Sequence, residues 1–186
     1  MFYEPILADR LQIDFGYNSD HVAYFFSIYT VSAFVVGLIL ILFPIKTRIP
    51  YWAALALILG IIGLILMGPS NWLGLPDSDI LIGIGLFFLS SAVQLLRVSS
   101  IVLILHPIKS QHPSQIRRIS KLLAVYNEII IGMSFLVTPL YSAAIYKALS
   151  YEDVCNILAV VVLGVLILLI LVTLIVEREE KIKSKN

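Results

Sequence analysis

Long apolar segments separated by short charged loops fill the chain from Val22 to Val176. A helix rises ~1.5 Å per residue, so about 20 mainly apolar residues cross the ~30 Å hydrocarbon core of a bilayer. Tyr51–Met67 is the shortest of the segments that approach this length. The full set is Val22–Phe43, Tyr51–Met67, Ile80–Leu105, Leu122–Tyr146 and Val154–Val176. The pattern predicts an all-α polytopic membrane protein with about five transmembrane helices.

The remaining regions complete the expected organisation. Residues 1–21 are expected to form a partial first helix and an outer loop, residues 22–176 the transmembrane bundle, and residues 177–186 a charged tail. Hydrophobic residues make up 60% of the chain and charged residues 13%, which is more apolar than a soluble domain. The single Cys155 can form no internal disulfide and belongs to no metal-binding pattern. We therefore expect neither a metal site nor a cofactor.

Basic residues gather in alternate loops, which is the pattern used to orient membrane proteins. Lys and Arg are retained on the cytoplasmic side of a membrane. One set of loops holds Lys46, Arg48, Lys109, Arg117, Arg118, Lys121, Arg178, Lys181, Lys183 and Lys185. The opposite set holds only Arg10 and Lys147. The sequence therefore predicts a multi-pass protein with its amino terminus outside or lumenal and its carboxyl terminus cytoplasmic.

Polar side chains are distributed unevenly among the five segments. Tyr51–Met67 and Val154–Val176 carry few hydrogen-bonding groups, so we expect these two helices to lie on the outside of the bundle. The other three segments carry polar stripes and are expected to be inner helices. The substrate-pathway candidates on them are Tyr24, Ser27, Thr30, Gln94, Arg97, Asn127, Glu128, Ser134 and Thr138. The same stripes are equally consistent with helix packing alone, because Ser, Thr and Gly commonly join membrane helices.

Arg97 and Glu128 are the only formal charges inside the apolar segments. A charge near the membrane centre costs about 2.5–3.5 kcal/mol on insertion scales, so each requires a partner or water. Helical geometry places them ~13 and ~10 Å from the cytoplasmic boundary, which allows an ion pair if the two helices are neighbours. The pair would serve a substrate pathway or would fix helix register. Alternatively, Arg97 extends alone toward the headgroups.

Several short motifs resemble the carboxyl-terminal six-helix half of a major facilitator superfamily transporter, of the vesicular-amine-transporter-like kind. Residues 2–8, with the sequence Phe-Tyr-Glu-Pro-Ile-Leu-Ala, are similar to the end of the first helix of that half. Leu66-Met67-Gly68-Pro69 resembles the end of its third helix, and Thr138-Pro139-Leu140 resembles its Gly-Pro helix. The resemblance implies that the third and sixth helices are peripheral and that Pro139 is a hinge candidate. The loop Phe43–Pro50 lacks the Gly and Asp of the family pattern.

These observations define the functional expectations. The resemblance implies transport of a small solute by a carboxyl-terminal lobe, either truncated from a longer chain or paired with a separate amino-terminal lobe. The alternative is a non-transporting accessory subunit of a membrane complex. An enzyme is not expected, because Ser/Lys, Asp/Asp and His-Glu-x-x-His arrangements are absent at membrane depth. The expected partners are the lipid bilayer and other membrane subunits, and no nucleic acid.

Overall fold

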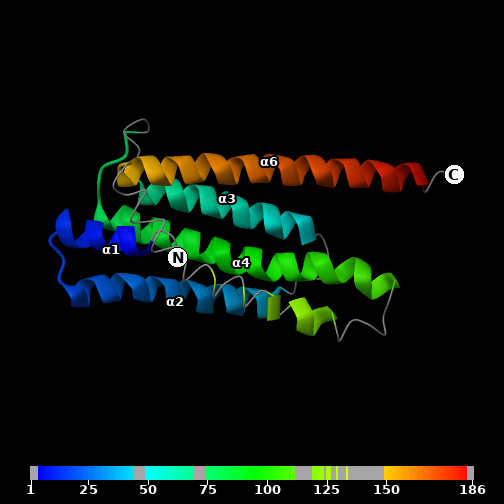
Figure 1. Cartoon of the computed structure of the whole chain (residues 1–186), viewed down its shortest axis with the longest axis horizontal. Helices are drawn as coiled ribbons and strands as arrows, with labels where there is room; N and C mark the ends of the chain where they lie inside the picture. Colours follow the sequence, from blue (N-terminus) through cyan, green and yellow to red (C-terminus); the bar gives the residue numbers. More distant parts are fainter. Residues whose placement is uncertain are drawn as a thin grey trace.

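The computed structural model of the chain describes residues 4–43, 49–68, 74–111, 119–123, 125–126, 129, 133 and 149–183. These residues form α1 (Glu4–Ile13), α2 (Ser19–Leu42), α3 (Ile49–Met67), α4 (Asp79–Gln111) and α6 (Tyr151–Lys183). Residues 119–123 are also helical, and no strand occurs within the described ranges. The long helices lie side by side in the order α6, α3, α4, α2, with α1 at one end (Figure 1). The described part of the chain is therefore all-α.

Four of these helices are long and apolar enough to cross a membrane: Ser19–Leu42, Pro50–Met67, Asp79–Val102 and Tyr151–Val176. They correspond to four of the five predicted segments, which confirms the prediction of a multi-pass membrane protein at this level. The fifth predicted segment, Leu122–Tyr146, lies for the most part outside the described residues. The side of the membrane on which each terminus lies stays a prediction.

Local hydrogen bonds explain where two of the helices begin. At the start of α2, the side-chain oxygen of Asn18 accepts a hydrogen bond from the His21 backbone N–H at 2.9 Å. At the start of α6, the Asp153 backbone N–H donates to Ser150 Oγ at 3.2 Å. Both arrangements satisfy backbone donors that lack a partner within the first helical turn. Gly16, with a φ of 67°, makes the turn between α1 and α2.

The position of α3 contradicts one expectation, since this helix was predicted to be outer. Buried residues make up 39% of its apolar window, compared with 44% in α4 and 11% in both α2 and α6. It lies between α4 and α6 and packs closely against α4 through Gly60 and Gly63. Small residues allow helix backbones to approach each other without polar side chains. The expectation for α6 is in agreement with the structure, because most of its surface is exposed. By the same measure α2, which was expected to be an inner helix, is as exposed as α6 in the described structure.

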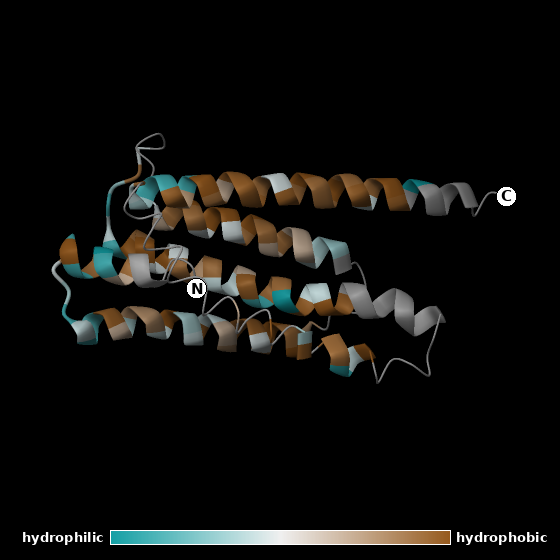
Figure 2. Cartoon of the chain, in the orientation of Figure 1, coloured by the Kyte–Doolittle hydropathy of each residue, from teal (hydrophilic) through white to brown (hydrophobic). Residues whose placement is uncertain are grey.

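The main core lies at the α1 end of the bundle, by which we mean the end where α2, α4 and α6 begin. Leu7 and Leu11 of α1 are fully buried there against Met67, Ile82 and other apolar residues. A helix of ten residues is marginally stable alone, so this burial holds α1 in place. Figure 2 shows the contrast along the molecule: apolar residues dominate the middle of the helices, and hydrophilic residues gather at the α1 end.

Candidate functional site

The three pathway candidates on α2 lie on the surface of the described structure. Tyr24, Ser27 and Thr30 are all exposed, and Tyr24 retains 72% of its accessible surface. The Ser27 hydroxyl donates a hydrogen bond to the Tyr24 carbonyl oxygen at 2.6 Å. A serine that bonds to its own helix can face an apolar environment at low cost. The first three turns of α2 thus carry three exposed polar side chains, those of Tyr24, Ser27 and Thr30.

Behind this face, α2 and α4 meet through a polar contact. Gln94 Nε2 lies 3.4 Å from the hydroxyl of Tyr29, in a partly buried position. Gln94 was among the predicted candidates, and Tyr29 was not, although it directly precedes Thr30 in the sequence. Arg97 lies one turn further along α4 and is half-buried. The structure thus places Gln94 at the interface between α4 and α2.

The remaining candidates lie outside the described residues. These are Asn127, Glu128, Ser134 and Thr138, together with the hinge candidate Pro139. The ion pair between Arg97 and Glu128 accordingly stays a prediction.

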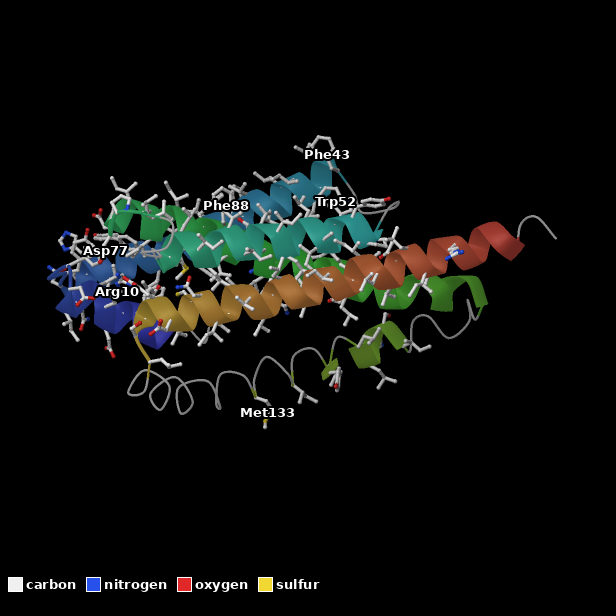
Figure 3. The ribbon with its side chains drawn as sticks, turned by 90° about the horizontal axis from the view of Figure 1, so that it is seen from above. Arg10, Phe43, Trp52, Asp77, Phe88 and Met133 are labelled. Atoms are coloured by element: carbon white, nitrogen blue, oxygen red, sulfur yellow. The ribbon has the colours of Figure 1, made fainter. Side chains whose placement is uncertain are left out.

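A charged cluster that the sequence did not reveal lies at the α1 end. Arg10 is 3% exposed, and its Nη2 donates a hydrogen bond to Asp77 Oδ1 at 2.8 Å. Its Nε lies 3.6 Å from Oδ2 of Asp14, which directly follows the end of α1. Its guanidinium carbon lies 4.5 Å from the centre of the Tyr151 ring, close enough for a cation–π interaction. Arg10 therefore joins α1, the loop before α4, and the first turn of α6. Figure 3 shows Arg10 and Asp77 at the same end of the bundle.

A second polar link joins the segment between α1 and α2 to the first residue of α4. The Tyr17 hydroxyl donates to Asp79 Oδ2 at 2.5 Å, and the other Asp79 carboxylate oxygen accepts the Ile80 backbone N–H at 2.8 Å. The hydrogen bond to the Asp79 carboxylate, with smaller contributions from burial and from the negative charge of Asp79, raises the pKa of Tyr17 above its usual value. The phenol consequently keeps its proton at neutral pH and can act as a stable donor to Asp79.

Two simple features of the sequence single out Arg10, although neither identifies Asp77 and Tyr151 as its partners. Arg10 and Asp14 are four residues apart, which places them on the same face of a helix. Arg10 is also one of only two basic residues in the set of loops predicted to lie opposite the basic loops. Asp77 and Tyr151 are 67 and 141 positions away in the chain, so no local pattern could have shown that they converge on Arg10.

The described residues offer no group of three His, Cys, Asp or Glu side chains placed to hold a metal ion. Cys155 is buried where the end of α3 meets the start of α6, and its side chain occupies the space beside Gly68. Its burial indicates a packing role.

Comparison of the chain with protein-family profiles, with curated proteins and with solved structures finds no match. The resemblance to major facilitator transporters rests on the sequence motifs alone.

Proposed function

We propose that this chain is one lobe of a membrane transporter for a small solute, in which the polar face of α2 lines a water-filled pathway against a complementary lobe. The observation that carries the proposal is a difference between the two outer faces. The exposed residues of α6 from Ile157 to Val176 are all aliphatic or glycine, as lipid contact requires. The exposed residues of α2 include Tyr24, Ser27 and Thr30. Polar groups in a membrane usually face a cavity or a protein partner.

Cysteine accessibility tests this proposal without knowledge of the substrate. In a chain carrying Cys155→Ser, we expect Ser27→Cys to react with a hydrophilic maleimide in native membranes about tenfold faster than Val160→Cys, because thiolate forms only where water is present. Val160 is 68% exposed on α6 and lies at a similar distance from its helix start, so it is the matched lipid-facing control. Equal, slow labelling at both positions would contradict a water-filled pathway.

The charged candidates give a second test. We expect Arg97→Ala and Glu128→Ala each to reduce uptake to the level of vector-only cells, for any solute that cells expressing the wild-type chain accumulate. A charged side chain within a membrane segment is energetically costly, so we expect both charges to be retained for a function in the pathway. The double charge exchange Arg97→Glu with Glu128→Arg should recover part of the uptake if the two side chains pair. Wild-type uptake in both alanine variants would remove these residues from the pathway.

One observation favours a second candidate, a non-transporting accessory subunit. The Ser27 hydroxyl is already satisfied by the Tyr24 carbonyl, so it does not require a solute or water as its partner. The face of α2 would then be a packing surface for another membrane helix. In that case Ser27→Cys would be protected from maleimide in the native complex and would become reactive after solubilisation separates the subunits.

A further inference from the structure

A groove of about 400 Å³ lies between α2 and α4 at the α1 end. Phe25 and Ile28 of α2 form one wall, and Ile80, Ile84 and Phe87 of α4 form the other. The groove is open at the side, where Ile80 is 69% exposed and Ile84 is 42% exposed. Both helices are long and apolar enough to cross a membrane, and an aliphatic opening between two such helices suits contact with lipid chains. A ligand that enters the groove from this side comes from the membrane.

Gly83 lines the groove, and because it has no side chain it leaves the space between the two helices open. A Cβ atom at this position would lie 3.5 Å from Ile28 Cδ1 and 3.6 Å from Phe25 Cε1, which are ordinary van der Waals distances. The backbone therefore does not require glycine here, in contrast to Gly63, where a Cβ atom would meet backbone atoms of α4. Any side chain larger than alanine at position 83 would project into the space between the helices and occupy it.

One carboxylate stands at the mouth of this apolar groove. Asp79 lines the groove at the first residue of α4 and accepts hydrogen bonds from the Tyr17 hydroxyl and the Ile80 backbone N–H. Both donors are neutral, and within the described ranges no Lys, Arg or His side chain forms an ion pair with Asp79. Among the described residues, Asp79 thus presents a carboxylate at the mouth of the groove whose hydrogen-bond donors are neutral.

The surroundings of Asp79 favour a cationic group over an anionic one. Asp20 lies in the first turn of α2, and Asp77 precedes Asp79 by two residues. Two basic side chains are described nearby: Arg10 is buried and already paired with Asp77, and the ring of His21, 5.7 Å from the Tyr17 ring, contacts the Asn18 side-chain oxygen through Nδ1. An anionic headgroup would meet net negative charge, whereas a primary ammonium could donate hydrogen bonds to Asp79, with Phe25 and Phe87 lining the same groove.

From these observations we infer that the groove between α2 and α4 binds a phospholipid with a primary ammonium headgroup, of the phosphatidylethanolamine class. One acyl chain lies between the two apolar walls, and the ammonium group contacts the Asp79 carboxylate. The inference does not rest on the proposed transport function, because a lobe and an accessory subunit would both present this groove to the bilayer.

Native mass spectrometry of the purified full chain tests the inference. The protein in detergent micelles receives phosphatidylethanolamine or phosphatidylglycerol with identical acyl chains. We expect the wild-type chain to retain phosphatidylethanolamine at least about fivefold more than phosphatidylglycerol. Excess free ethanolamine should not displace the lipid, because it lacks the acyl chain. Equal retention of the two phospholipids, or displacement by ethanolamine alone, would overturn the inference.

Two pairs of variants separate the groove from the headgroup contact. Gly83→Leu should reduce retained phosphatidylethanolamine about fivefold by filling the groove, whereas Gly164→Leu, in open space on α6, should retain the wild-type amount. Asp79→Asn should bring the ratio of the two phospholipids to about one, while Asp20→Asn should preserve the preference. The amide oxygen introduced by Asp79→Asn can still accept a hydrogen bond from Tyr17 or Ile80, so this arm decides the question even if Gly83→Leu fails to fold. Unchanged selectivity in Asp79→Asn would contradict the inference.

Discussion

Replacing Gly63 by alanine is expected to separate α3 from α4 and to destabilise the bundle by about 3 kcal/mol, the upper part of the range for overpacking. A Cβ atom at Gly63 would lie 2.6 Å from the Leu89 backbone nitrogen and 2.8 Å from the Gly85 carbonyl oxygen. A backbone atom cannot rotate away as a side chain can, so the whole helix must move. The measurement is the midpoint of unfolding in mixed micelles of increasing denaturing detergent, compared with the wild-type chain.

Two further variants sharpen this prediction. Gly164→Ala places the same methyl group in open space on α6 and should leave the midpoint unchanged. Gly85 faces Gly63 across the interface, and its Cβ atom would lie 2.8 Å from the Gly63 carbonyl oxygen. The double variant Gly63→Ala with Gly85→Ala should therefore cost clearly less than the sum of the two single variants, because the first methyl group already separates the helices. Additive effects would indicate that the two glycines act at independent contacts.

The Gly63 contact also explains which part of the fold could be predicted from the sequence. Apolar segments of sufficient length identified four of the helices, because the hydrocarbon thickness fixes their length whatever they pack against. The position of each helix within the bundle depends on side-chain shape as well as polarity. Tyr51–Met67 has almost no polar side chain, yet its glycines make it one of the two most buried long helices described. Sorting helices by polarity alone therefore misplaced α3.

For the candidate residues, the sequence could predict only which of them share one side of a helix, and their role in a pathway stays a prediction. The spacing of Tyr24, Ser27 and Thr30 places them on one side of α2, and the structure finds all three exposed. The contact between Gln94 and Tyr29 depends on how α2 and α4 rotate against each other, which helical periodicity does not determine. Arg10 lies in residues 1–21, which were expected to form a partial first helix and an outer loop, and a single charge there gives no information about burial.

The second large effect concerns the Arg10 cluster: removal of Asp77 is expected to destabilise the protein more than removal of Arg10. Asp77→Ala should destabilise the protein by about 3 kcal/mol, because it leaves a buried guanidinium without its hydrogen-bonded carboxylate. Arg10→Met should cost only about 1–2 kcal/mol, since it removes the buried charge together with its hydrogen bond. The methionine side chain can still pack against the Tyr151 ring through its sulfur. Detergent unfolding midpoints of the two variants provide the comparison.

A double variant and amide hydrogen exchange test whether the unpaired charge of Arg10 causes this destabilisation. Arg10→Met combined with Asp77→Ala should be about as stable as Arg10→Met alone, because no unpaired charge remains in it. Asp9→Ala removes an exposed carboxylate from the same helix and serves as the control, with an expected change within about 0.5 kcal/mol. Since α1 has only ten residues and depends on tertiary contacts, Asp77→Ala should also accelerate amide hydrogen exchange in α1 more than in α3. If Asp77→Ala proves no more destabilising than Asp9→Ala, Arg10 is held by its apolar surroundings, by Tyr151 and by Asp14, and its ion pair with Asp77 contributes little.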